Sequence, residues 1–108
     1  MTLLQQRDLA RRQRRLEAYA ETRQRLRAAL TELMPGGNVI VFGSLTRPGV
    51  FNDRSDVDLA LEAEPPGLNT WQLTAELMER LRRPVDIVLL PKSRFRDKIL
   101  REGERWTL

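Results

Sequence analysis

The sequence predicts a small α/β fold of the mixed, α+β kind, in which helices pack on a sheet of three strands, or of four. Three observations lead to this prediction. Apolar residues recur at helical steps over the first 33 residues. Three short apolar runs, at 38–42, 56–61 and 85–90, are typical of strands. Breaks rich in Pro and Gly separate these segments, so we expect the order helix, strand, turn or short helix, strand, helix, strand, helix.

The N-terminal segment, residues 1–34, is predicted to be one long helix. Thr2 and Gln5 form a T-x-x-Q capping box at its start. Pro35 and the two glycines that follow it are expected to end the helix. The apolar stripe that should face the sheet consists of Leu9, Leu16, Tyr19, Leu26, Leu30 and Leu33.

Two shorter helices are predicted in the second half of the chain. Asn69 and Gln72 match the capping-box pattern of the first of them. Its expected buried residues are Leu73, Leu77 and Leu81. Ser93 is expected to cap the last helix and Gly103 to end it. The buried side of that helix should hold Phe95, Ile99 and Leu100. No internal repeat is visible, and residues 1–108 are expected to form a single domain.

The composition excludes several kinds of chemistry. The chain contains neither cysteine nor histidine, which rules out disulfides, thiolate metal sites and catalysis by His or Cys. Carboxylates, hydroxyls, cations, the backbone or a bound metal remain. No apolar run approaches the ~20 residues that span a bilayer, and the N-terminus lacks the apolar core of a signal peptide. We therefore expect a cytoplasmic protein that does not enter a membrane.

The net charge of +4 is unevenly distributed. Residues 1–33 hold eight arginines and four acidic residues, whereas the remainder holds eleven cations and eleven acidic residues. A basic segment of this kind can bind nucleic acid. The solvated face of an arginine-rich helix is, however, the commoner explanation of such a segment.

Three aspartates stand among the apolar segments. Asp56 and Asp58 are two residues apart at the start of a predicted strand, so both should project from one face. A divalent cation such as Mg²⁺ would relieve their repulsion. Asp86 lies within the third apolar run, where a lone carboxylate is costly unless it is paired or bound to a metal. Simpler interpretations remain: a turn cap for the first pair, and an ion pair of Asp86 with Arg82 or Arg83.

Three segments taken together resemble a known family. They are VIVFGS at 39–44, SDVDLAL at 55–61 and VDIVLL at 85–90. With these motifs the sequence resembles a minimal nucleotidyltransferase (MNT) domain of the polymerase-β-like superfamily over most of its length. The resemblance implies the nucleotidyltransferase fold. The spacer between Ser44 and Asp56 has eleven residues, one more than is common in that family.

The resemblance implies a binding site for a nucleoside triphosphate. Gly43 would let the backbone approach the phosphates closely, and Ser44 would donate a hydrogen bond to the β- or γ-phosphate. Arg47 would neutralise phosphate charge. The expected nucleotide substrate is ATP.

The resemblance also implies a metal-binding and catalytic role for the three aspartates. Asp56 and Asp58 would hold Mg²⁺ against the phosphates. Asp86 would complete a second metal site and help to activate an incoming hydroxyl. Two Mg²⁺ ions can support the in-line transfer of a nucleotidyl group.

Minimal members of the superfamily resemble the antitoxins of HEPN/MNT toxin–antitoxin pairs. The implied reaction is transfer of AMP from ATP to a hydroxyl, that of a tyrosine, on a HEPN ribonuclease toxin, with which the chain would form a hetero-oligomer. One alternative is an inactive module that binds nucleotide or partner and neutralises the toxin by occlusion. Another is a nucleic-acid-binding protein, which would leave the aspartates unexplained.

Two segments are candidates for docking the partner. One is the start of the N-terminal helix, with Leu3, Leu4 and Leu9 among arginines. The other is the C-terminal segment 106–108, whose tryptophan would otherwise cover an edge of the core.

Overall fold

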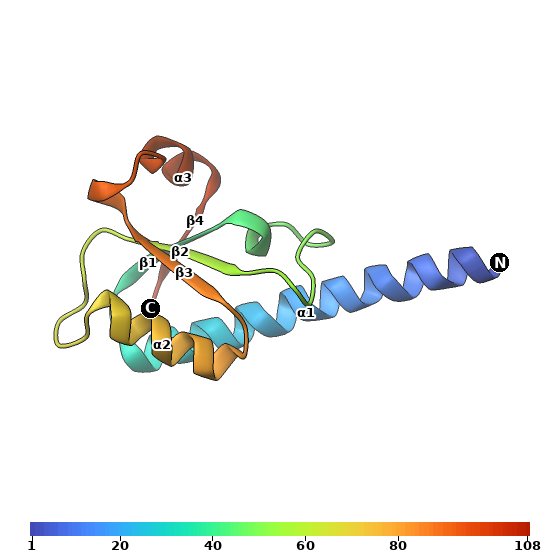
Figure 1. Cartoon of the computed structure of the whole chain (residues 1–108), viewed down its shortest axis with the longest axis horizontal. Coiled ribbons are helices and arrows are strands. Elements are labelled where there is room, and N and C mark those ends of the chain that lie inside the picture. Colours follow the sequence, from blue (N-terminus) through green and yellow to red (C-terminus); the bar gives the residue numbers. More distant parts are fainter.

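The computed structural model describes residues 1–108. Its helices are α1 (Leu3–Leu33), α2 (Thr70–Leu81) and α3 (Arg96–Glu102). Its strands are β1 (Asn38–Phe42), β2 (Val57–Leu61), β3 (Val85–Leu89) and β4 (Glu104–Thr107). Two short 3₁₀ helices, η1 (Gly43–Thr46) and η2 (Leu90–Lys92), follow β1 and β3. The predicted order of elements is confirmed, with one strand added at the C-terminal end (Figure 1).

The four strands form one mixed sheet in the order β3-β2-β1-β4. β1 is antiparallel to both of its neighbours, β2 and β4. β2 and β3 are parallel, and α2 makes the crossover between them. The prediction of a mixed α+β fold is therefore confirmed, and the larger of the two predicted strand numbers is the correct one.

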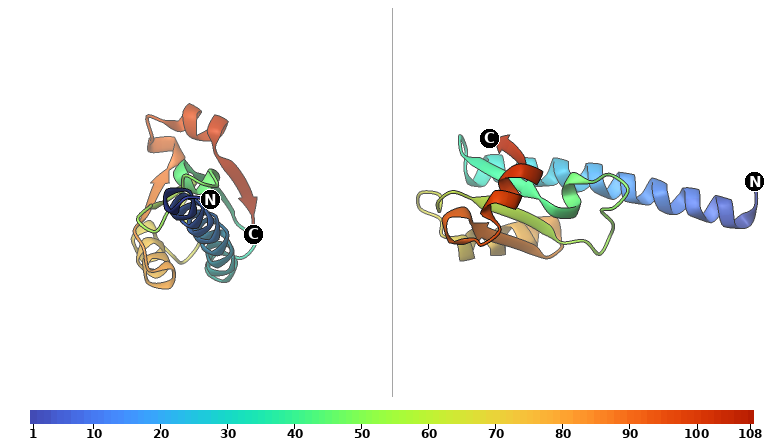
Figure 2. Two further views of the ribbon diagram at one scale, coloured as in Figure 1. Left: turned by 90° about the vertical axis from the view of Figure 1, so that its right-hand side faces the viewer. Right: turned by 90° about the horizontal axis from the view of Figure 1, so that it is seen from above.

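The sheet has a main core on one face and a small apolar cluster on the other. α1 and α2 pack on the main face, where Leu26, Leu59 and Leu77 are fully buried. The opposite face carries a cluster made by Ile40, Ala60, Leu90 and Ile99, under η2 and α3. Figure 2 shows the two long helices on one side of the sheet and α3 on the other. Polar residues that alternate with the main-core positions of β2 and β3 therefore lie on the face of the small cluster.

α1 differs from the prediction in where its apolar stripe becomes buried. The Thr2–Gln5 capping box is present, but Leu9 and Leu16 are 52% and 37% exposed. Burial begins at Ala18, because the first half of the helix extends past the sheet (Figure 1). The helical spacing of apolar residues in α1 therefore begins ahead of Ala18, where there is no sheet surface to cover. None of the helices, α1 included, combines the length and the apolarity of a membrane span.

The C-terminal segment also differs from expectation. Trp106 lies in β4 with only 4% of its surface exposed, and its side chain belongs to the main core. The prediction that this residue could dock a partner is therefore wrong. In α3 only Ile99 is buried, whereas Phe95 and Leu100 are 61% and 38% exposed. Ser93 lies too early to cap α3 directly, and its hydroxyl instead accepts a hydrogen bond from the Phe95 amide. A helix of seven residues has room for little more than one inward side chain.

Arg23 ties α1 to β4 and η1. Its guanidinium donates to both carboxylate oxygens of Glu104, at 3.2 and 2.7 Å, and to the Leu45 carbonyl at 2.9 Å. It also lies over the Trp106 ring, 5.1 Å from the centroid. The hydrogen bond from Arg23 lowers the pKa of Glu104 from its ordinary 4.5, against the opposing effect of burial. The sequence carries no signal for this contact, since the partners are 81 residues apart.

A pH-dependent loss of stability is expected when Glu104 is changed to Gln. Because its pKa is lowered on folding, ionised Glu104 stabilises the fold above pH 4.5, and this contribution is lost as the pH falls through the lowered pKa. Solvent screens the pair, so we expect a difference of at most about 1 kcal/mol at neutral pH. Urea unfolding of both proteins between pH 3 and 7 measures it. A difference that is constant over this range would contradict the assignment.

Candidate functional site

Asp58 and Asp86 lie side by side on adjacent parallel strands. The register of β2 and β3 pairs Asp58 with Asp86, and Val57 with Val85. Paired residues in a parallel sheet project from the same face. Val57 and Val85 enter the main core, so both carboxylates lie on the opposite face, near the start of their strands. Asp86 is exposed and Asp58 is half-buried.

Gly43 brings the end of β1 into direct contact with Asp58. Phe42 pairs with Asp58 across β1 and β2, and the chain turns at Gly43 into η1. Gly43 has a φ of +74°, which favours glycine. A Cβ atom at this position would overlap Oδ2 of Asp58. The absence of a side chain at Gly43 therefore leaves the space that the Asp58 carboxylate occupies.

The negative charges of Asp56 and Asp86 both act on Asp58. The pKa of Asp58 is raised from its ordinary 3.8, first by burial, then by the negative charge of Asp86 and then by that of Asp56. Asp56 is exposed and lies one residue before β2. Such a group of like charges favours the binding of a proton or a cation.

The carboxylates fit a Mg²⁺ ion in which substrate and water complete the ligand set. As the side chains stand, no group of three or more acidic residues is arranged to hold an ion. Mg²⁺ is usually bound by one or two carboxylates together with substrate phosphates and water. Asp58 and Asp86 are adjacent, and the half-buried Asp58 is partly desolvated, so the two residues can supply the protein's share of such a site. Asp56 would join them if its side chain turned toward Asp58.

The predicted phosphate-binding residues lie around the same turn. Ser44 is half-buried in η1, next to Gly43. The Thr46 hydroxyl donates to the Gly43 carbonyl at 2.7 Å and so holds the turn. Arg47 ends η1 and is exposed. The structure thus places Gly43 against Asp58 and Ser44 next to Gly43 in the turn, and the phosphate-binding roles of Gly43, Ser44 and Arg47 stay predictions.

Arg83 holds the loop that precedes Asp56, a function that sequence analysis missed. Its guanidinium donates to the carbonyls of Asn52 and Ser55, at 3.0 and 2.8 Å, and lies 4.5 Å from the centroid of the Phe51 ring. Neither Arg83 nor Arg82 forms an ion pair with Asp86, so the simpler interpretation of that aspartate is wrong. Burial lowers the pKa of Arg83, with the nearby acidic groups of Asp53, Asp56 and Glu21 opposing this effect. One residue therefore links the loop before β2 to the start of β3.

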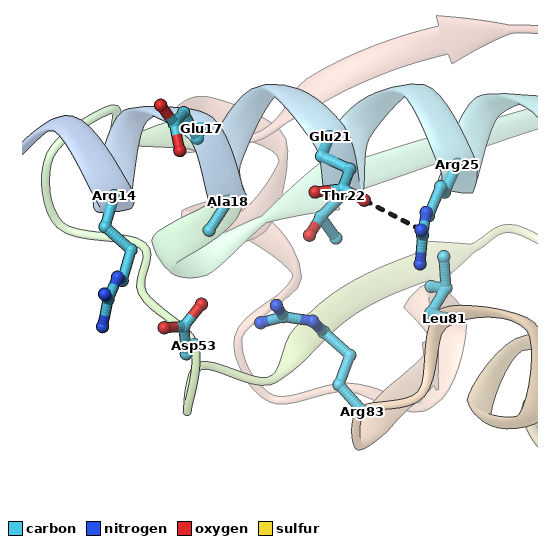
Figure 3. Close-up of a pocket in the computed structure, with 9 residues that line it drawn as sticks. All are labelled: Arg14, Glu17, Ala18, Glu21, Thr22, Arg25, Asp53, Leu81 and Arg83. Carbon is cyan, nitrogen blue, oxygen red and sulfur yellow. Dashed lines mark ion pairs between the residues drawn. The ribbon is translucent and has the colours of Figure 1, made fainter.

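A cleft of about 180 Å³ lies on the other side of this loop, against α1. Figure 3 shows Arg83 and Asp53 in it opposite the helix, where Arg25 and Glu21 form an ion pair of 2.8 Å. Its lining mixes three arginines with three acidic residues and includes none of the residues around Gly43. With its charges balanced and no contact with Asp58 or Asp86, the cleft is not the candidate site.

The fold and the site together place a glycine turn and two adjacent carboxylates on one face of a mixed sheet. A protein-family model described as "Polymerase beta, Nucleotidyltransferase" matches residues 37–106, which is more than half of the chain. The chain belongs to this nucleotidyltransferase family. A comparison with curated protein sequences gives no match.

A solved structure is also similar to this chain. It is described as "Crystal structure of the toxin-antitoxin with AMP-PNP", and it aligns with a TM-score of 0.59 and 22% sequence identity. The alignment covers 79% of this chain and 73% of the other. At this identity the likeness shows a common fold.

Proposed function

We propose that this chain is a Mg²⁺-dependent nucleotidyltransferase that transfers AMP from ATP to a hydroxyl of a HEPN-type toxin, a tyrosine hydroxyl, and thereby acts as its antitoxin. The observation that carries the proposal is the contact of the Gly43 turn with Asp58, whose neighbour across the strands is Asp86. Binding of triphosphate at the turn would place its phosphates beside both carboxylates.

Each residue has a defined task in the proposed reaction. Gly43 and Ser44 bind and orient the triphosphate, and Arg47 neutralises part of its charge. Asp56, Asp58 and Asp86 would hold two Mg²⁺ ions, which would supply neutralisation of the negative charge that develops in the transfer. Asp86 accepts the proton of the acceptor hydroxyl and passes it to solvent. The bond between the acceptor oxygen and the α-phosphorus forms, the bond from that phosphorus to the bridging oxygen breaks, and pyrophosphate leaves.

The toxin partner is supported by the solved structure that shares this fold. That protein occurs in a toxin–antitoxin complex with AMP-PNP. A nucleotide and a protein partner in one such complex are what the proposed reaction requires.

The proposal is tested by incubating the chain with Mg²⁺, a HEPN-type protein encoded beside it, and ATP labelled at the α-phosphorus. We expect label on the partner, none after chelation of Mg²⁺, and none when the label is on the γ-phosphorus. Neutralisation of the toxin without label would favour occlusion. A complex with RNA in place of the partner, weakening steeply with salt, would favour the nucleic-acid interpretation.

Deletion of residues 1–12 is expected to weaken the complex with the partner while leaving nucleotide binding unchanged. This part of α1 is wholly exposed and has Leu3 and Leu4 uncovered at 83% and 67%. Its three arginines and single acidic residue suit an acidic groove on the partner. A pull-down measures the complex, and calorimetry measures Mg²⁺·ATP binding. Unchanged capture of the partner would place docking on another surface.

A further inference from the structure

β3 forms one edge of the sheet, so its backbone is paired on one side only. At the start of its ladder with β2, the Val57 amide donates to the Pro84 carbonyl at 3.0 Å. Peptide groups alternate in direction along a strand, so those of Val85, Ile87 and Leu89 turn away from β2. An apolar edge strand with outward amides is a template for a further strand unless something covers it.

A groove of about 450 Å³ lies beside this edge, between β3 and α2. Trp71, at the start of α2, lines it with 85% of its surface exposed. The half-buried side chains of Ile87 and Leu89 form its apolar floor, and Lys92 adds a cation. The exposed indole and the apolar floor lie together in one groove at an unpaired sheet edge, an arrangement that suits a binding partner. Figure 1 shows α2 alongside β3.

The groove and the candidate active site lie on opposite faces of the sheet at the β3 edge, and Asp86 borders both. This residue belongs to the edge strand, lines the groove and is the neighbour of Asp58. A strand added to β3 would place every second side chain on the face of Asp86. Side chains paired across strands have Cβ atoms about 5 Å apart. A hydroxyl side chain on the added strand would therefore arrive beside the Asp86 carboxylate.

We propose that the acceptor is a polypeptide that adds to the edge of β3 as an extended fifth strand and presents its hydroxyl beside Asp86. This inference rests on the proposed function, in which Asp86 accepts the proton of that hydroxyl. The outward amides and carbonyls bind the acceptor backbone. Trp71 packs against an apolar or aromatic side chain, and Lys92 pairs with an acidic one.

Other occupants fit the edge less well. A second copy paired through β3 in the register that sets the two Asp86 residues opposite each other would be destabilised by the like charges. RNA would need several cations for its phosphates, whereas the groove offers only Lys92 and places Asp86 against them. A polypeptide satisfies both the backbone groups and the apolar floor.

The test separates binding of the acceptor from binding of the nucleotide. Trp71→Ala removes the exposed wall, and Ile87→Pro removes an outward amide while leaving the amides that bond to β2. Met78→Ala is the control, because Met78 is 43% exposed on α2 and does not line the groove. The substrates are Mg²⁺, α-labelled ATP and the co-encoded HEPN-type protein. Calorimetry of Mg²⁺·ATP and thermal melting are run on every variant.

We expect Trp71→Ala and Ile87→Pro to raise KM for the protein acceptor by about tenfold or more, as loss of an anchoring side chain does, with Mg²⁺·ATP affinity and kcat little changed. Met78→Ala should match the wild type. Wild-type KM in Trp71→Ala would overturn the inference, even if the proline variant fails to fold. Transfer to RNA alone would overturn it as well. If the wild type binds Mg²⁺·ATP and labels no acceptor, the proposed function itself fails.

Discussion

Asp58→Asn is expected to abolish nucleotidyl transfer and to make the metal-free fold more stable. The change removes a carboxylate oxygen from the pair formed with Asp86, and loss of a direct ligand should lower transfer by at least about a hundredfold. It also removes a charge that burial and two nearby carboxylates disfavour. A labelling assay and thermal melting on the same preparation measure the two effects.

The gain in stability should depend on pH in a defined direction. Because the pKa of Asp58 is raised on folding, the folded state binds its proton more tightly than the unfolded state does. The stability of the wild type therefore falls as the pH rises from 3.8 through the raised pKa, and Asn at this position escapes that loss. The advantage of the variant should be absent below pH 3.8 and should grow as the pH rises through the raised pKa.

Asp53→Asn is the matched control for this experiment. Asp53 is exposed in the loop before β2 and lies outside the carboxylate pair. It should keep wild-type transfer. Full activity in Asp58→Asn would remove Asp58 from the metal site, whereas loss of activity in both variants would point to a general effect of charge.

Gly43→Ala is expected to lower the affinity for Mg²⁺·ATP by about tenfold or more, the scale found when the support of a metal ligand is disturbed. The new methyl group would overlap Oδ2 of Asp58 and force that carboxylate out of its position. It would also stand where a phosphate approaches the backbone. Calorimetry with Mg²⁺ and ATP measures the loss.

Gly49→Ala separates this effect from backbone strain. Gly49 has a φ of +89°, close to the +74° of Gly43, so alanine at either position costs about 1–2 kcal/mol of conformational energy. A Cβ atom at Gly49 meets nothing within 4 Å. Both variants should melt at similarly reduced temperatures, but only Gly43→Ala should show a lowered affinity for Mg²⁺·ATP. Equal nucleotide binding by the two variants would contradict the role given to Gly43.

Local signals in the sequence predicted most of the secondary structure. The capping boxes at Thr2 and Asn69 both form, since each needs only residues three positions apart. The spacing of Leu73, Leu77 and Leu81 predicted the buried face of α2. The turn at Pro35 ends α1 as expected, with Gly36 at a φ of +77°.

The failures arise where tertiary contact decides. Leu9 and Leu16 follow the helical period, but the sheet that would bury them ends near Ala18. The sequence did not predict β4, because a strand of four residues with a single buried tryptophan shows almost no alternation of buried and exposed side chains. Its pairing with β1 supplies the hydrogen bonds that the local sequence cannot indicate.

The candidate site was predictable in part. The family motifs predicted Gly43, Asp58 and Asp86 as site residues. The register of β2 and β3 brings the two carboxylates together. Nothing in the sequence distinguished Arg83 from sixteen other arginines. Arg83 holds the loop through two carbonyls about 30 positions earlier in the chain. Contacts between residues that far apart produce no periodic pattern in the sequence.

Because Arg83 fixes the loop before Asp56, it also determines where residues can be inserted or deleted between Ser44 and Asp56. Phe51 is fully buried, and the carbonyls just after it are fixed by Arg83. Residues 48–50 precede this anchor, and Val50 is 52% exposed. An inserted or deleted residue there would change a surface turn and leave Asp56 in place. The same change after Phe51 would displace the carboxylates, so length differences among relatives should concentrate ahead of the anchor.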